Sequence, residues 1–451
     1  MINTMPKLVG RRGAFAAVSA ILISACATPA YQPNVPLSPS VQPVYAFRAL
    51  AHPGNSDSLL VVMALSGGGY RAAAFGYAAL EALSQTRVRW ESEDKRLIDE
   101  LDVLVGVSGG SLTAAYYALH RDLTFTNFVP DVLSVDLQSD LFARTLSPRG
   151  LWRAAAARFG RGDILQEVLD EAVFRGVTYA ELPRVRPLLI VDATDMISGE
   201  LFQFAQEQFD DLCSDLGPLP LARAVAASTA VPIFFSPITM WNYREQCPVQ
   251  GSRPPWVTAL RKQRYVHLLD GGLSDNLGVR GPLEAIVGRG GLITTLAVSG
   301  LHDVRKLVFI VVNSQVAPEF GEDSTPNTPG LLRQLSAIVD IPIHRYSSAS
   351  MQTLRLSIEG WKREVAAFNA SRPPSEQQQI EFYVIDVSAE SADDVPGTHA
   401  MRDIATVLRL GAAQLETVRR VARKRLAADP DFQRLLFDLN GSQSSEIQGA
   451  P

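Results

Sequence analysis

The chain has 451 residues, of which 47% are hydrophobic and 20% are charged, and its formal net charge is −5. This length supports a large buried core, and the composition is that of an ordinary globular protein. Proteins that bind nucleic acid usually concentrate basic charge, so the mild acidity argues against a nucleic-acid partner.

The first 26 residues have the features of a targeting segment. A basic start (residues 7–12) precedes a short apolar stretch (residues 14–23) that cannot span a bilayer permanently. The tetrapeptide Ile-Ser-Ala-Cys that ends at Cys26 resembles a bacterial lipobox, in which the cysteine is acylated and becomes the new N-terminus. The alternative is a plain secretory signal without a role for Cys26. By resemblance to sorting rules, Ala27 favours anchoring in the outer membrane, facing the periplasm.

Strand and helix patterns alternate along the body of the chain. Apolar runs that suit buried strands occupy residues 59–65, 101–107, 187–191, 266–269 and 306–312, with a further candidate at 380–387. Helical patterns lie between them. This alternation predicts an α/β protein with three layers, in which a mostly parallel sheet is covered by helices on both faces.

Several intervening segments have patterns of their own. Residues 85–100 are charged and helical in pattern. Residues 125–174 are helical and rich in apolar side chains, which suits either a mobile cap over a site or a helical layer. Later helical patterns are at residues 331–339, 347–368 and 401–426.

These patterns divide the chain into five parts. They are a signal peptide (1–25), a Pro/Ser-rich tether (26–57), the main α/β domain (58–315), a mainly helical C-terminal extension (316–440) and a polar tail (441–451). Cys213 and Cys247 either form a disulfide or remain free thiols, because the sequence does not give their separation in space. They lack the spacing of a metal site, and no metal is predicted.

Three consecutive glycines, Gly67, Gly68 and Gly69, join the first strand to a helix. Their backbone N–H groups and the start of the helix form a cradle for an anion such as an oxyanion. Arg71, just inside the helix, suits either a phosphate head group or a structural salt bridge. The glycines also fit a dinucleotide fingerprint, but this needs a second strand that ends in an acid about 20 residues on, and residues 85–100 are helical in pattern.

Ser108 is the centre of a Gly-x-Ser-x-Gly motif at residues 106–110, between a strand and a helix. This context is required for a nucleophile elbow, although a serine at a helix start is also a common N-cap. Asp270 ends the strand candidate at residues 266–269, which predicts a carboxylate at the same edge of the sheet as Ser108. A carboxylate within hydrogen-bond reach of a serine can act as its base. The alternative is that Asp270 only forms an Asp-Gly turn, which is very common.

Histidine is the usual base for such a serine. His302, His344 and His399 follow Asp270, but none lies in a convincing loop at the end of a strand. A two-residue centre of serine and aspartate therefore fits the sequence better than a triad.

Together these motifs resemble those of the patatin-like phospholipase family, here as a bacterial lipoprotein member. The sequence SGGGYR (residues 66–71) looks like the family's oxyanion loop, residues 106–110 match its nucleophile motif, and Asp270-Gly271-Gly272 matches its second catalytic motif. Residues 192–204 and 224–235 resemble the family's segment after the cap and the helix and proline turn that line its acyl pocket. The resemblance covers residues 59–312.

The resemblance implies a patatin-like fold and a serine lipid acyl hydrolase of phospholipase A or lysophospholipase type. Ser108 becomes the nucleophile, Asp270 the base, the loop of Gly67, Gly68 and Gly69 the oxyanion site, and Arg71 a substrate-binding residue. The implied substrate is a phospholipid or other lipid ester, cleaved through an acyl-enzyme without metal or other cofactor. The lipid on Cys26 would hold the protein at the membrane. An acyltransferase with the same two residues and a non-catalytic envelope scaffold are the alternatives.

Overall fold

The computed structural model describes residues 30–31, 33–38, 45–246, 263–316, 326–389, 401, 404 and 408–441. Within these residues, eight strands form a central sheet in the order β12-β11-β2-β5-β6-β10-β9, with β7 paired to β6 outside this path. The strands are β2 (Leu59–Leu65), β5 (Leu101–Val107), β6 (Leu188–Asp195), β7 (Leu201–Phe204), β9 (Ile238–Trp241), β10 (Tyr265–Asp270), β11 (Lys306–Asn313) and β12 (Glu381–Ser388). From β12 to β6 they are parallel, whereas β7 and β10 run antiparallel to β6, and β9 runs antiparallel to β10.

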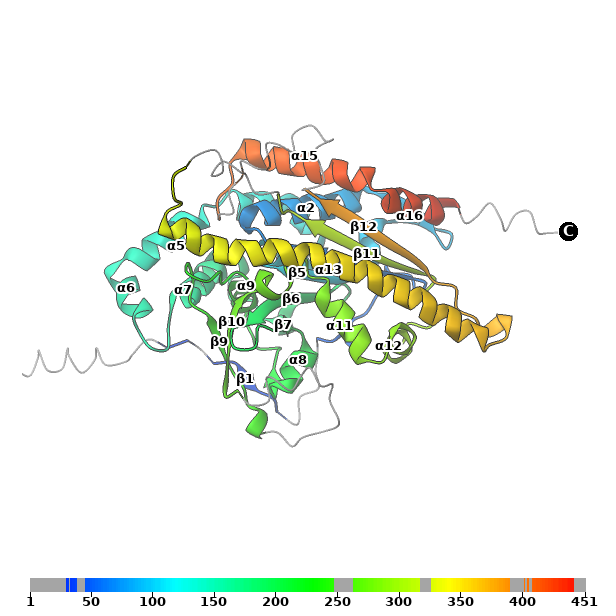
Figure 1. Cartoon of the computed structure of the whole chain (residues 1–451), viewed down its shortest axis with the longest axis horizontal. Coiled ribbons are helices and arrows are strands. Elements are labelled where there is room, and N and C mark those ends of the chain that lie inside the picture. Colours follow the sequence, from blue (N-terminus) through cyan, green and yellow to red (C-terminus); the bar gives the residue numbers. More distant parts are fainter. Residues whose placement is uncertain are drawn as a thin grey trace, which may run out of the picture.

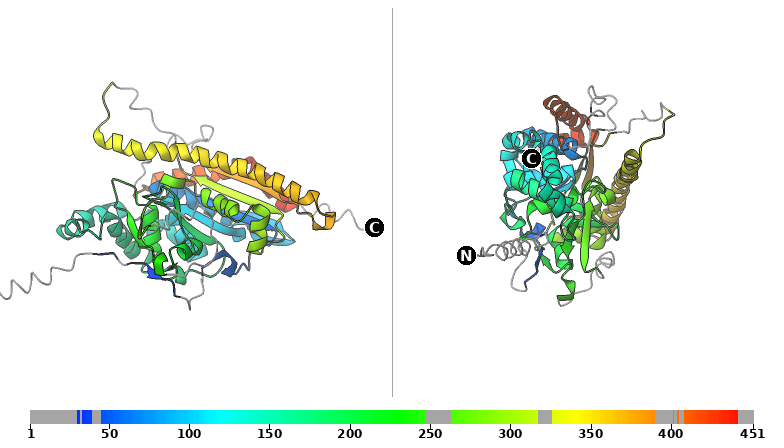
Figure 2. Two further views of the ribbon diagram at one scale, coloured as in Figure 1. Left: turned by 60° about the horizontal axis from the view of Figure 1, so that its bottom comes forward. Right: turned by 90° about the vertical axis from the view of Figure 1, so that its left-hand side faces the viewer.

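Helices cover both faces of this sheet (Figures 1 and 2). One face carries α2 (Gly69–Gln85), α3 (Gly109–His120), α9 (Leu221–Ser228), α15 (Ala412–Ala428) and α16 (Pro430–Gly441). The other face carries α11 (Arg280–Gly288), α12 (Leu292–Ser299) and α13 (Leu331–Ala370). The predicted three-layer α/β/α fold with a mostly parallel sheet is confirmed.

The remaining elements are short or peripheral. They are β1 (Val35–Pro36), β3 (Arg87–Trp90), β4 (Glu93–Arg96), α4 (Thr124–Phe128), α5 (Leu137–Leu146), α6 (Pro148–Ala154), α7 (Arg161–Leu169), α8 (Gln206–Asp211), β8 (Ser214–Asp215) and α10 (Gly272–Asp275).

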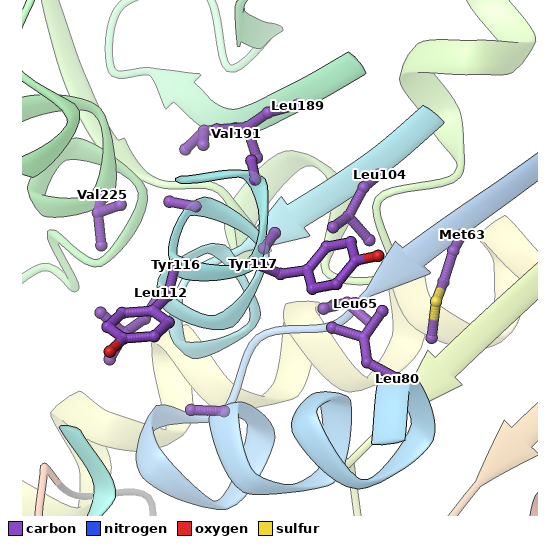
Figure 3. Close-up of a cluster of buried hydrophobic side chains, with 14 of the residues drawn as sticks. Met63, Leu65, Leu80, Leu104, Leu112, Tyr116, Tyr117, Leu189, Val191 and Val225 are labelled. Atoms are coloured by element: carbon purple, nitrogen blue, oxygen red, sulfur yellow. The ribbon is translucent and has the colours of Figure 1, made fainter. Parts of the chain in front are cut away.

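Alternation along the strands builds a separate core on each face of the sheet. In β2, Met63 and Leu65 belong to one core, and Val62 and Ala64 belong to the other. Figure 3 shows part of the first core, where side chains of the sheet meet those of α2 and α3. Met63, Leu65, Leu104, Leu189 and Val191 come from strands, and Leu80, Leu112, Tyr116 and Tyr117 come from helices. This packing fixes the ends of β2 and β5, where the two glycine motifs begin.

Residues 85–100 do not form the helix that their charge pattern predicted. They contain the hairpin of β3 and β4, followed by a short 3-10 helix. Val88 and Trp90 point to the buried side of this hairpin, while Arg87 and Arg89 are exposed. Glu91 and Ser92 take up the left-handed backbone of a tight turn, with φ of 52° and 67°. Burial of two alternate side chains outweighed the weak helical preference of the charges.

Residues 125–174 are largely helical, as predicted, and include α5, α6 and α7. α7 packs against α9 and so belongs to the layer that covers the sheet. α5 and α6 lie at one end of the molecule (Figure 1) and leave apolar side chains exposed.

The C-terminal third contributes directly to the main sheet, since β12 pairs in parallel with β11 along its whole length. α13 is one 40-residue helix that continues through Pro342, not the two helices predicted. Its buried side chains, among them Leu354 and Trp361, hold it on the sheet and offset the hydrogen bond that proline removes. Within the amphipathic stretch predicted at residues 401–426, the structure shows helix α15 from Ala412.

Some sequence predictions fall outside the described residues, namely the signal peptide, Cys26, Cys247, His399 and most of the polar tail. Cys213 is disulfide-bonded, as one of the two alternatives requires. Among the described helices, none combines the length and the apolar character needed to cross a bilayer.

Candidate active site

Ser108 lies at the sharp turn between β5 and α3. Its backbone adopts φ 49° and ψ −121°, a region that residues other than glycine rarely occupy. The flanking glycines make this turn feasible. A Cβ at Gly106 would lie 2.5 Å from the Cα of Ser111, and one at Gly110 would lie 2.4 Å from the carbonyl oxygen of Leu65. This is the geometry of the nucleophile elbow that the motif predicted.

Asp270 meets Ser108 directly. The Ser108 hydroxyl donates to Oδ2 of Asp270 at 2.8 Å, and the other carboxylate oxygen accepts from the N–H of Gly272 at 2.8 Å. Both side chains are buried, with relative exposures of 5% and 3%. A direct bond of this length leaves no room for an imidazole between the two groups, so the pair has the geometry of a two-residue centre.

The antiparallel strand β10 brings Asp270 to Ser108. β5 pairs with residues 188–192 of β6, and β10 pairs with residues 193–195. β7 pairs with residues 191–194, which overlap both the segment paired with β5 and the segment paired with β10. β7 therefore lies on one side of β6, and β5 and β10 lie on the other side. β10 is antiparallel, and its last residue therefore approaches the last residue of β5 end to end. This end-to-end approach brings the two side chains together.

Burial sets the proton affinity of the Asp270 carboxylate. Loss of solvent raises its pKa from 3.8 to about 6, against the opposing effects of the hydrogen bonds from Gly272 and Ser108. At neutral pH the group is thus largely ionised, yet basic enough to accept a proton from a hydroxyl in contact with it.

Ser228, at the end of α9, contacts both halves of this pair. Its hydroxyl accepts from the N–H of Ser108 at 2.7 Å and donates to the carbonyl of Asp192 at 2.6 Å. Its own carbonyl accepts from the N–H of Gly271, next to Asp270, at 3.1 Å. Sequence reasoning assigned the segment 224–235 to a pocket wall and missed this residue. A serine at a helix end is too common for the sequence to have marked this one.

The glycine loop lies directly against the nucleophile turn. A Cβ at Gly109 would fall 1.9 Å from the carbonyl oxygen of Gly69, so the two turns touch through glycine backbones. The N–H of Gly67 donates to the carbonyl of Asn276 at 3.1 Å and is engaged within the protein. Among the described residues, no hydrogen-bond partner is found for the N–H groups of Gly68 and Gly69. Of the three predicted donors, these two remain available to an oxyanion.

The dinucleotide alternative lacks its structural context. After α2 the chain enters the β3–β4 hairpin, which is separate from the central sheet. The next strand of the central sheet, β5, ends at Val107 and not at an acidic residue. No second strand of the required kind follows the glycines in this part of the structure.

Asn276 links the glycine loop to helix α13. Besides its carbonyl bond to Gly67, its side-chain amide lies 3.3 Å from the hydroxyl of Ser347 on α13. A Cβ at Gly67 would lie 2.5 Å from Oδ1 of Asn276, so the loop has no space for a larger residue there. The C-terminal extension therefore helps to hold the loop in place.

Arg71 has a structural environment. Its side chain is 8% exposed, and Nη1 donates to the carbonyl of Ile404 at 2.7 Å. Burial lowers the pKa of its guanidinium to about 10, which still leaves it charged at neutral pH. The substrate-binding role expected from the sequence is not supported by this position, because the head group is committed to the C-terminal segment. Arg71 instead braces the start of α2.

The described residues contain no group of three or more His, Cys, Asp or Glu side chains arranged to hold a metal ion.

Comparisons with known proteins identify the family. A family model described as patatin-like phospholipase matches residues 63–283, a range that contains Ser108, Asp270 and the glycine loop. A comparison with curated protein sequences gave no match.

Solved structures with a related arrangement were also found. Human GIVD cytosolic phospholipase A2 is 11% identical, with a TM-score of 0.45 over 85% of this chain and 62% of that one. VipD from Legionella pneumophila is 14% identical, with a TM-score of 0.28 over 88% of this chain and 72% of that one. The chain thus spans less than two thirds of the human protein's length. Residues 63–283 are therefore a patatin-like phospholipase domain.

Proposed function

We propose that this protein is a serine lipid acyl hydrolase that cleaves ester bonds of phospholipids or related lipids through Ser108 and Asp270. The observation that carries the proposal is the 2.8 Å hydrogen bond from the Ser108 hydroxyl to the buried Asp270 carboxylate. Ser108 lies on a strained turn beside the N–H groups of Gly68 and Gly69, which have no partner among the described residues. Membership of the phospholipase family supports lipid esters as the substrate class.

In the first half of the proposed reaction, Oγ of Ser108 attacks the ester carbonyl carbon while its proton passes to Asp270. The carbonyl oxygen becomes an oxyanion, to which Gly68 and Gly69 donate their N–H groups. Donors of this kind contribute about 3–4 kcal/mol each to the transition state. Collapse of the intermediate breaks the bond to the alcohol, which leaves with the proton from Asp270, and the acyl group remains on Ser108.

In the second half, water attacks the acyl-enzyme. Asp270 accepts a proton from the water, the oxyanion forms again in the same cradle, and collapse releases the fatty acid. The proton held by Asp270 returns to Oγ of Ser108, which restores the starting state. One carboxylate serves both halves because it contacts the reacting oxygen directly.

The test compares the wild type with Ser108→Ala and Asp270→Asn, on a soluble short-chain ester and on phospholipid vesicles. Each substitution should lower turnover at least about 10³-fold, by analogy with losses of paired catalytic groups. A fluorophosphonate should label the wild type at Ser108 and fail to label Ser108→Ala. Full turnover by Asp270→Asn, or an unlabelled but folded wild type, would overturn the proposal.

We also propose that the chain is lipid-anchored through Cys26 to a bacterial outer membrane, facing the periplasm. The lipobox-like tetrapeptide that ends at Cys26 supports this. Mass spectrometry of the mature N-terminus provides the test, since an acylated Cys26 is expected in the wild type and none in Cys26→Ser. Two or more acyl chains at one terminus would give firm anchoring.

A further inference from the structure

Helices α5 and α6 present a row of apolar side chains to solvent. On α5, Leu141 is buried, whereas Phe142 and Leu146, one turn apart, are 55% and 66% exposed. On α6, Leu151 and Trp152 are 54% and 53% exposed. Large apolar groups gathered on consecutive helices are uncommon on a surface that faces only water, and they typically mark an interaction site.

The same segment is strongly basic within an acidic chain. Residues 137–161 contain five arginines and one aspartate, a net charge of +4, whereas the whole chain has −5. Arg144 and Arg153 form ion pairs with neighbouring carboxylates. Arg149, Arg158 and Arg161 are exposed, and no ion pair involves them among the described residues. The apolar row is therefore flanked by positive charge that is available to an anionic partner.

A turn next to the catalytic pair continues this surface. Arg161 donates to the carbonyl of Ile233 at 2.9 Å, which joins the start of α7 to the turn at residues 231–236. In this turn Phe234 is 58% exposed and Ile233 is 39% exposed. The carbonyl of Ala230, just before the turn, accepts from the N–H of Asp270 at 3.0 Å. The apolar surface thus begins a few residues from the carboxylate.

This surface and the Ser108 site lie toward the same end of the molecule. Figure 1 shows β11 and β12 pointing to the end at which α5, α6 and α7 lie, and α16 lies at the opposite end. The carboxyl ends of the parallel strands carry the glycine loop and Ser108.

We infer that α5, α6 and the turn at residues 231–236 form an interfacial surface that docks on a bilayer containing anionic phospholipid. This inference rests on the proposed function, since it presents the Ser108 site to its substrate. Apolar side chains enter the boundary between head groups and acyl chains, while the arginines meet anionic head groups. The pairing of exposed aromatic groups with net positive charge selects a lipid surface over a second copy of this acidic chain.

The fluorescence of Trp152 measures whether this surface contacts lipid, whether or not the N-terminus is anchored to a membrane. The full chain is mixed with vesicles of anionic phospholipid with brominated acyl chains, and the fluorescence of Trp152→Phe is subtracted from that of the wild type. We expect the Trp152 signal to fall at least twofold, because bromine quenches only at close range. Zwitterionic vesicles, or substitution by Arg149→Glu with Arg158→Glu, should reduce the quenching severalfold.

In the matched control, the tryptophan is placed on α16, at the opposite end of the molecule. Phe437 on α16 is 76% exposed, so Phe437→Trp in the Trp152→Phe background should remain unquenched. Equal quenching at both positions, or none at Trp152, overturns the inference. A dimer that dissociates on Phe142→Ser would instead identify the surface as a contact between copies and would also overturn it.

Comparing turnover of vesicles with turnover of a soluble ester distinguishes membrane docking from catalysis. Phe142→Ser with Leu151→Ser should lower hydrolysis of anionic vesicles about tenfold or more and leave hydrolysis of a soluble short-chain ester unchanged, and Phe437→Ser should change neither. Unchanged vesicle hydrolysis in the double variant contradicts docking. A wild type that is inactive on both substrates contradicts the proposed function, whereas the Trp152 measurement still decides the docking surface.

Discussion

Ser228 holds Ser108 through a 2.7 Å hydrogen bond between its hydroxyl and the backbone N–H of the nucleophile. The carbonyl of the same residue accepts from Gly271, the neighbour of Asp270. The two proposed catalytic residues are 162 positions apart in the sequence, so their alignment depends on such shared contacts. Ser228 is a positioning residue, because it acts on the reacting groups only through the backbone.

The first prediction is that Ser228→Ala lowers kcat on a soluble ester about 10–100-fold while KM stays within about twofold, because a small displacement of reacting atoms is costly. Thr229→Ala is the matched control. Its hydroxyl is also buried, but it bonds the carbonyl of Val225 within the same helix end. Steady-state kinetics and melting temperatures of both variants provide the check. Equal losses of kcat in the two variants would reduce Ser228 to a structural residue.

The second prediction concerns the stability cost of the buried Asp270 carboxylate. Its folded pKa of about 6 lies above its ordinary value of 3.8, so the folded state binds the proton more tightly. The associated stability is complete below about pH 4 and is lost as pH rises through 6. Asp270→Asn should therefore be inactive yet more stable than wild type at pH 7, by about 1–3 kcal/mol. Urea unfolding at pH 7 and pH 4 checks this, and the difference should shrink at pH 4.

Asp102 supplies the control for this measurement. It is also fully buried, and burial raises its pKa to about 7, but it accepts hydrogen bonds from the buried guanidinium of Arg186 at 2.8 Å and from the N–H of Val61. Asp102→Asn should lower stability by about 3–5 kcal/mol, because it leaves the arginine without its charge partner. A gain of stability in both variants would mean that burial alone, and not the catalytic position, sets the sign.

The third prediction is a single ionisation near pH 6 in the rising limb of kcat/KM. Asp270 must be ionised to accept the Ser108 proton, so activity falls as pH drops through the raised pKa of the carboxylate. An uncharged ester keeps substrate ionisation out of the profile. The rate of fluorophosphonate labelling should follow the same limb, since it also requires activation of Ser108. A limb that persists in the residual activity of Asp270→Asn would assign the ionisation to another group.

Six strands of the sheet were predictable because they are mostly apolar runs between glycines, helices or charged segments. Their pairing was not, since β10 runs antiparallel to β6 and also pairs with β9, a short strand that the patterns did not reveal. The hairpin at residues 87–96 was missed for a related reason. Burial of only two side chains, Val88 and Trp90, decides its structure, and a window of mostly charged residues hides that signal.

Within the site, the sequence predicted the residues whose chemistry is distinctive. Ser108 and Asp270 belong to glycine-rich motifs that few other roles require. The hydrogen bond of Ser228 is set by tertiary contacts between three distant segments, and serine is too common for its position to be informative. Arg71 illustrates the opposite case. Its place in a motif suggested a ligand, but the fold covers it with Ile404 from the C-terminal third.

The fourth prediction follows from this environment of Arg71. Arg71→Met should lower activity by the same factor on a neutral short-chain ester and on an anionic phospholipid, because it loosens the start of α2 and binds no head group. It should also cost about 1–3 kcal/mol, since the buried carbonyl of Ile404 loses its donor. The ratio of kcat/KM for the two substrates is the measurement. A selective loss on the anionic substrate would restore the substrate-binding role.

The fifth prediction contrasts two glycines. A Cβ at Gly110 would lie 2.4 Å from the carbonyl oxygen of Leu65, a backbone atom that cannot move without disturbing the end of β2. Gly110→Ala should cost about 1–3 kcal/mol and reduce fluorophosphonate labelling. Gly360, inside helix α13, has no atom within 4 Å of an added Cβ, so Gly360→Ala should instead gain about 0.5–1 kcal/mol through helix propensity. Thermal unfolding of both variants gives the comparison. Tolerance of Gly110→Ala with full labelling would show that the two turns need not approach as closely as their backbones do here.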